Sequence, residues 1–175
     1  MAVIKSIADL SEEEAKGFEE FCVSYFRKEC IKSNVAYPHL SMIDTYLGAR
    51  KRTLLMMRDI ATGVTTGFVA YDFDFTTKKD GIDLIPVGLI VGYDTPAGMN
   101  NLMHFFVKDE LNSYPRLTVM KDLLSSYVEV AKTNGSRQIQ TTSDIYDPRL
   151  TRDLKDFDFA KVGNNGTEEI YKRAI

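Results

Sequence analysis

The chain of 175 residues is 44% hydrophobic and 27% charged, with 25 acidic side chains against 22 basic ones and a formal net charge of −3. A composition of this kind is typical of a globular domain with its own core, and it excludes a disordered or fibrous chain. The mild acidity gives no electrostatic reason to expect a nucleic acid or an anionic membrane as the main partner. We therefore expect one domain over residues 1–175.

Cysteine, histidine and hydropathy patterns exclude further classes. Cys22 and Cys30 lie about 12 Å apart if one helix carries both, beyond the roughly 7 Å that a disulfide spans. The two histidines are far apart and there is no Cys-x-x-Cys, so we predict no metal site. No apolar run approaches the roughly 18 residues of a membrane span, and residues 1–10 lack the pattern of a secretory signal. We expect a cytoplasmic protein with reduced thiols.

The N-terminal part predicts a short strand at residues 3–7 and two helices. The segment 11–14 (Ser-Glu-Glu-Glu) has the spacing of a capping box, and apolar residues at steps of three and four follow it on one helix face. These residues are Ala15, Phe18, Cys22, Tyr25 and Phe26. A shorter helical pattern runs from Leu40 to near Gly48, before the basic cluster 50–52, which is either a solvated helix end or an anion site.

The runs 53–58 and 67–75 flank a segment of turn residues, 59–63, and together predict a β-hairpin. In the second run Asp72 and Asp74 alternate with aromatic residues, which predicts one dry and one wet face. The wet aspartates could bind a cationic substrate or guard a strand edge against pairing.

The stretch 76–101 is expected to be an extra insertion between this hairpin and the next strand. Its apolar part, 81–93, contains Pro86, Gly88 and Gly92, so it is either a strand pair or a packed loop. It could serve as a substrate lid, a dimer contact or part of the core.

The C-terminal half alternates strands and helices. Residues 102–107 are apolar on both alternating faces, as in a central strand. Beyond Pro115, apolar residues at steps of three and four predict a long helix that Asn-Gly at 134–135 ends. The remaining elements are strands at 138–142, 159–162 and 169–171 and a short helix that begins at Asp147 and Pro148. This order predicts a mixed α/β domain with one strand–helix–strand crossover between residues 102 and 142.

Three segments carry a resemblance to a known superfamily. Residues 105–110 (Phe-Phe-Val-Lys-Asp-Glu) look like its fourth strand, 116–121 (Arg-Leu-Thr-Val-Met-Lys) stand in the place of its pyrophosphate loop Arg/Gln-x-x-Gly-x-Gly/Ala, and 147–163 look like its closing helix and strand. Over nearly its whole length the chain resembles the GNAT superfamily of N-acetyltransferases. The resemblance implies a mixed, mainly antiparallel central sheet flanked by helices, with the parallel crossover described above.

The chain departs from the family motifs at four positions. Val119 and Lys121 stand where the loop has glycines, which let backbone amides approach the coenzyme closely. Leu154 stands at the place of the usual general-acid tyrosine, and Asp158 replaces a glycine. The helix dipole does not depend on these side chains, and Lys121 could add positive charge.

The resemblance implies transfer of an acetyl group from acetyl-CoA to an amine of a small molecule or a protein. It implies coenzyme contacts at the strand end and the following turn: Phe106, Val107, Arg116, Leu117, Thr118, Val119, Met120, Lys121 and Asp122. His104, the only histidine near the seam between the fourth and fifth strands, is the candidate base. Tyr146 is the candidate acid in place of the absent tyrosine. Each also has a structural interpretation, as a buried strand histidine and as a tyrosine packed near a helix cap.

Other residues and another class of function stay open. Glu110 and Asp144 are alternative bases, although acidic residues at loop ends usually cap helices or face solvent. Arg116 is either a phosphate contact or an exposed arginine. The alternative function is a catalytically inactive GNAT-fold module for binding or assembly, such as an accessory protein of a phage-like particle. A homodimer or a protein partner is compatible with both functions.

Overall fold

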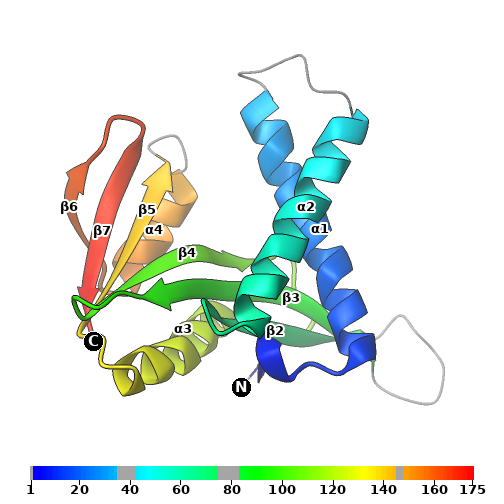
Figure 1. The fold of residues 1–175 in the computed structure, drawn as a ribbon, viewed down its shortest axis with the longest axis horizontal. Helices are drawn as coiled ribbons and strands as arrows, with labels where there is room; N and C mark the ends of the chain where they lie inside the picture. Colours follow the sequence, from blue (N-terminus) through cyan, green and yellow to red (C-terminus); the bar gives the residue numbers. More distant parts are fainter. Residues whose placement is uncertain (1, 35–41, 75–82, 145–147) are drawn as a thin grey trace.

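A seven-stranded sheet organises the molecule (Figure 1). The computed structural model describes residues 2–34, 42–74, 83–144 and 148–175. The strands are β1 (Val3–Ser6), β2 (Thr66–Asp74), β3 (Asp83–Asp94), β4 (Met99–Val107), β5 (Gln138–Asp144), β6 (Ala160–Asn164) and β7 (Glu168–Ala174). Their spatial order is β1-β2-β3-β4-β5-β7-β6. All neighbours are antiparallel except β4 and β5, which are parallel, so the predicted fold class and crossover are confirmed.

Helices cover both faces of the sheet (Figure 1). Helices α1 (Glu12–Asn34) and α2 (Met42–Ala61) lie side by side on one face, after a short 3-10 helix (Ile7–Asp9). Helices α3 (Arg116–Thr133) and α4 (Pro148–Asp156) lie on the other face. Each face therefore has its own apolar core, one built with α1 and α2 and the other with α3 and α4. No helix in the described part of the chain is long and apolar enough to cross a membrane.

Local sequence signals place two helix ends correctly. The Ser11 amide donates to the Glu14 carboxylate at 3.0 Å and the Glu14 amide donates to the Ser11 hydroxyl at 3.3 Å, which is the predicted capping box. At the end of α3, Gly135 adopts a φ of 89° and the Ser136 amide donates to the Ala131 carbonyl at 2.9 Å. The predicted left-handed stop is thus confirmed. Cys22 is a buried free cysteine, as expected.

The prediction of a strand at 53–58 is wrong, because these residues belong to α2. Gly48 does not end this helix either, since a glycine inside a helix costs only about 1 kcal/mol. The buried residues Ala49, Thr53, Met56 and Ile60 follow one another at helical steps and pack toward α1 and the sheet. Packing of this stripe outweighs the glycine and the basic cluster that follows it.

The predicted insertion at 76–101 is wrong for the residues that the structure describes. Residues 83–94 are strand β3, which pairs with β2 on one side and with β4 on the other. The open choice at 81–93 is therefore resolved, for the described residues, as one long central strand. The hairpin is formed by β2 and β3, and the segment that joins them lies outside the described residues.

Candidate active site

Strands β4 and β5 run parallel but separate after a short stretch. Among the described residues their pairing covers residues 99–101 of β4 and 138–140 of β5. The Thr141 hydroxyl adds one bond, to the Leu102 carbonyl at 3.1 Å. At Met103 the register of β4 with β3 shifts by one residue, which is a β-bulge. A bulge bends its strand and can end pairing, and Figure 1 shows that β4 and β5 diverge along their length.

Hydrogen bonds hold the paired end of this opening together. The Asp94 carboxylate accepts bonds from Asn100 at 2.9 Å, Asn134 at 2.8 Å and Ser136 at 2.6 Å, and so joins β3, β4 and the end of α3. Tyr127 of α3 donates to the Asn100 side chain at 2.8 Å. Burial acts to raise the pKa of Asp94, but the three hydrogen bonds outweigh it and the pKa lies below its usual value. These bonds therefore fix the end of the sheet at which β4 and β5 are paired.

His104 follows the bulge and faces α1. Its ring lies edge-on to Phe26, with centroids 5.0 Å apart, and to Tyr25 at 6.4 Å, and the Tyr25 ring in turn stacks near Phe106 at 4.5 Å. Burial, together with the nearby Arg52 cation, lowers the pKa of His104 to about 4. The imidazole is consequently neutral at pH 7: it can accept a proton, but as a weaker base than an exposed histidine.

Arg116, at the start of α3, is bound by groups of the chain itself. Its Nη1 lies 2.7 Å from Asp153 of α4, and its Nε donates to the Val107 carbonyl at 3.2 Å and lies 3.8 Å from Asp109. The Asp153 side chain is 4% exposed and that of Arg116 is 16% exposed. Arg116 is thus half of a largely buried ion pair rather than an exposed arginine.

Asp72 holds the loop before α3 from the opposite side. It is 1% exposed, so the expectation of a wet face at this position is wrong. Its carboxylate accepts the backbone amides of Phe73 at 2.9 Å, Asn112 at 2.5 Å and Ser113 at 3.2 Å. Burial acts to raise the pKa of Asp72, yet these bonds keep it below its usual value. A carboxylate of the protein therefore occupies amides that could otherwise receive an external anion.

The other predicted coenzyme residues differ in how far they are buried. Val107, Val119 and Met120 are buried in the core with α3, Phe106 is half-buried against α1, and Leu117, Thr118 and Lys121 are exposed. Asp122 accepts the Ala2 backbone amide at 3.1 Å. No side chain caps the N-terminus of α3, whose N-cap is Pro115. At this junction, exposed groups for a ligand come from the first turn of α3 and from Lys121.

Of the remaining acid and base candidates, the structure describes the side chain of Glu110 alone. Tyr146 lies outside them, and nothing is described of the Asp144 side chain. Glu110 is exposed, and Leu154, at the place of the family tyrosine, is 1% exposed in the core. Asp158 has a φ of 63°, so the backbone keeps the left-handed conformation expected of the glycine that it replaces.

Sequence analysis missed three residues at this site: Asp72, Asp153 and Tyr25 as a neighbour of His104. Asp72 was interpreted as a residue of a wet strand face and Asp153 was not singled out, because only the tertiary structure shows a carboxylate to be buried against a distant amide or guanidinium. Tyr25 was found as part of an apolar helix face, and this face was the one signal available. The described residues contain no group of three or more side chains that could hold a metal ion.

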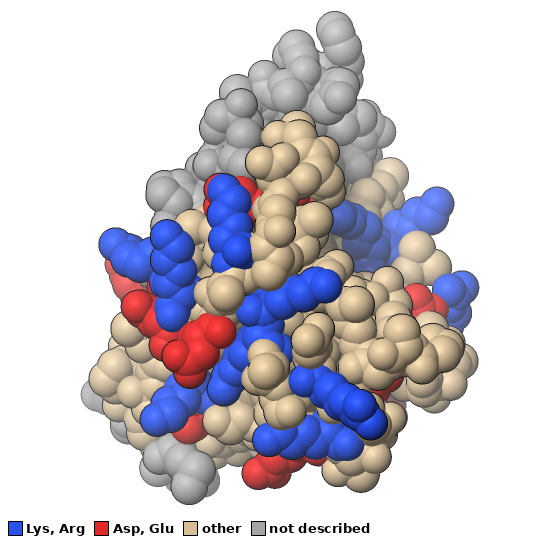
Figure 2. Space-filling model, turned by 90° about the vertical axis from the view of Figure 1, so that its left-hand side faces the viewer, with Lys and Arg blue, Asp and Glu red and all other residues tan. Residues whose placement is uncertain are grey.

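Surface charge is uneven despite the net charge of −3. Figure 2, which views the side of β6 and β7, shows Lys and Arg side chains spread over this face and Asp and Glu side chains in smaller groups. Net acidity therefore does not exclude an anionic ligand from approaching this side.

Comparison with solved structures identifies the fold. The PaiA N-acetyltransferase of Thermoplasma acidophilum, solved in complex with coenzyme A, has a TM-score of 0.68 and 14% identity, covering 100% of this chain and 99% of that one. The protein PH1933 of Pyrococcus horikoshii OT3 has a TM-score of 0.64 and 16% identity, covering 100% and 99%. An acetyltransferase of Streptococcus agalactiae 2603 has a TM-score of 0.63 and 11% identity, covering 99% and 98%. The chain has the GNAT acetyltransferase fold. No protein-family model and no curated protein matches it.

The residues present fit the thioester of a coenzyme, but they offer fewer groups to its pyrophosphate than the family motif does. The open edge of β4 and the uncapped start of α3 offer backbone groups, and Lys121 offers an exposed cation. Arg116 is bound to Asp153, and the side chain of Val119 is buried. A coenzyme would therefore be held mainly by backbone groups.

Proposed function

We propose that the chain is an acyltransferase that moves an acetyl group from acetyl-CoA to an amine of a small molecule or a protein. The observation that carries the proposal is the bulge at Met103, beyond which β4 is open on the side of β5. Acetyl-CoA would supply an activated acyl group there. Backbone groups of β4 beyond Leu102 would align it by hydrogen bonds, and the first turn of α3 with Lys121 would attract its phosphates.

The chain's own residues would provide proton transfer and a dry environment. His104 is neutral at pH 7 because its pKa is about 4, so its imidazole can take the proton of the attacking amine. Tyr25, Phe26 and Phe106 surround it with aromatic surface that limits access of water. Tyr146 is the proposed acid for the departing thiolate. We place this chemistry in the cytoplasm, where the buried thiol of Cys22 stays reduced.

The experiment that tests the proposal is thermal unfolding with acetyl-CoA, coenzyme A and a nucleotide that lacks the pantetheine arm. A ligand at about 100 times its Kd stabilises the fold by about 2.7 kcal/mol, which for a domain of this size raises Tm by roughly 5–11 °C. We expect this shift with both coenzymes and a smaller one with the nucleotide. Release of free thiol in the presence of a panel of amines then measures turnover, which we expect His104→Gln to reduce.

A specific observation favours the second candidate function, a binding or assembly module without activity. Arg116 and the amides of Asn112 and Ser113 are bound by Asp153 and Asp72, as expected of a junction that no longer receives phosphate. Absence of any Tm shift at millimolar coenzyme would exclude the acyltransferase and leave this module as the function of the fold.

A further inference from the structure

Helix α2 exposes an apolar face that the proposed chemistry does not use. Leu47, Leu54 and Leu55 are 54%, 49% and 40% exposed. Exposed leucines are common singly on a protein surface, but a group on one helix marks an interaction surface. The buried residues of α2 (Ala49, Thr53, Met56 and Ile60) lie on the opposite side of the helix, as the period of 3.6 residues requires.

The exposed face is hollowed and basic. Leu47, Arg50, Lys51, Leu54, Leu55 and Arg58 line a shallow hollow of about 460 Å³. All charged residues among them are cations, although the whole chain has a net charge of −3. The spacing of 47, 51, 54 and 58 follows one side of the helix over about 16 Å, the length of three helical turns.

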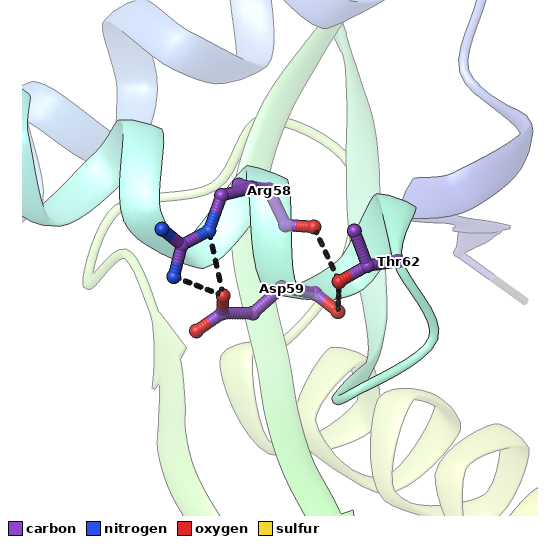
Figure 3. A network of polar contacts seen from close by, with 3 residues as sticks. All are labelled: Arg58, Asp59 and Thr62. Atoms are coloured by element: carbon purple, nitrogen blue, oxygen red, sulfur yellow. Dashed lines mark hydrogen bonds and ion pairs between the residues drawn. The ribbon is translucent and has the colours of Figure 1, made fainter.

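Two of the three cations that line this hollow have a carboxylate of the chain beside them. Arg58 turns back onto Asp59, with Nη2 and Nε 2.8 and 3.1 Å from the same carboxylate oxygen, and Thr62 closes the helix end by donating to the Arg58 carbonyl at 3.0 Å (Figure 3). The Arg50 guanidinium lies 3.9 Å from Glu19 of α1. Lys51 is exposed and has no ion pair with the described residues. Its charge is available to a partner.

We infer that this face of α2, the α2 docking face (Leu47, Arg50, Lys51, Leu54, Leu55 and Arg58), binds an acidic amphipathic helix of another protein. Leucines of the partner would fill the hollow, and a flanking glutamate or aspartate would meet Lys51. A second copy is disfavoured because a two-fold contact of this face with itself sets cations against cations. A lipid bilayer is disfavoured because a hollow receives protruding side chains, whereas a bilayer takes up a protruding apolar surface.

The test uses two fluorescent amphipathic peptides with leucines on one helical face, one with glutamates beside them and a twin with lysines at the same positions. We expect the acidic peptide to bind the full chain at least about tenfold tighter than its twin, measured by fluorescence anisotropy. Leu54→Ser and Lys51→Glu should each weaken this binding by about tenfold. The matched controls Val162→Ser on β6 and Lys132→Glu on α3 change exposed residues elsewhere and should leave it within about twofold.

Three results would overturn the inference. Equal binding of both peptides would exclude charge recognition at the α2 docking face. Cosedimentation with phosphatidylserine vesicles that Lys51→Glu abolishes would assign the face to a membrane. Self-association in sedimentation velocity that Leu54→Ser abolishes would assign it to a second copy. Because all substituted side chains are exposed, unchanged thermal unfolding of the variants confirms that each result reports binding.

Discussion

The open part of β4 and the junction between β4 and α3 satisfy their polar groups in opposite ways. Beyond the bulge at Met103, the edge of β4 has no pairing with β5 among the residues that the structure describes, so its backbone can bind a ligand. At the junction, by contrast, Arg116 is bound by Asp153 and the loop amides are bound by Asp72. The difference shows that sheet register sets where the β4 backbone is left without a strand partner, whereas the anion-binding groups next to it depend on a few side chains that bind one another.

The largest expected effect comes from breaking the closed junction. Asp153→Ala leaves the mostly buried Arg116 cation without its closest partner and should lower the free energy of unfolding by about 3 kcal/mol or more. Asp109→Ala removes the exposed carboxylate near the same arginine and should cost less than about 1 kcal/mol. Urea unfolding of both variants measures this. Equal costs would mean that Asp153 does not dominate the junction.

The next effect tests the packing around Gly92, beside the end of β4 that pairs with β5. A Cβ at Gly92 would lie 2.1 Å from the Tyr127 hydroxyl and 2.4 Å from the Asn101 carbonyl oxygen. Gly92→Ala should therefore destabilise the fold by about 1–3 kcal/mol and disrupt the Tyr127–Asn100 bond. Gly17→Ala, where a Cβ meets nothing within 4 Å, is the control and should be neutral or stabilising. An unchanged free energy of unfolding for Gly92→Ala would contradict tight packing around Gly92.

A smaller effect concerns pH at His104. The pKa of His104 is about 4 in the fold against a usual value near 6.5, so the unfolded chain takes up a proton first as the pH falls. The stabilisation that neutral His104 gives the fold is nearly complete above pH 6.5 and is lost progressively down to pH 4. At pH 5 the free energy of unfolding is lower by about 2 kcal/mol from this group. Unfolding in urea between pH 7 and 5 measures this loss. His104→Gln should flatten the dependence in this window, and an unchanged slope would place the titration on other groups.

The smallest effect tests whether the closed junction can be reopened to phosphate. Asp153→Asn keeps a hydrogen-bond acceptor for Arg116 but removes the negative charge, so the guanidinium charge is no longer neutralised by Asp153. If the proposed function holds, the affinity for coenzyme A, measured by calorimetry, should rise about fivefold. The affinity for pantetheine, which carries no phosphate, should not change. Asp156→Asn, on the same helix, is the matched control. No difference between the two variants would separate the Arg116–Asp153 pair from ligand binding.

Local signals predicted much of the fold. The capping box at Ser11 and the Asn134-Gly135 stop were correct because both depend on residues within one helical turn. Prediction failed at α2 and β3, where local cues conflicted with burial. Gly48 and the basic cluster at 50–52 indicated a helix end, and Pro86 and two glycines indicated a loop, but packing on both sides of the sheet outweighed them.

For the candidate site too, local features could be predicted from the sequence and long-range contacts could not. The sequence by itself determined the order of elements in the C-terminal half, the strand–helix–strand crossover and the position of His104 on the central strand, because periodicity and turn chemistry are local. Only the tertiary structure decided that β4 is bulged and parts from β5, and that Asp72 and Asp153 bind groups 40 and 37 residues away. The physical reason is that a buried carboxylate is stable only where distant donors meet it, and those donors are brought together by the packing of the whole sheet.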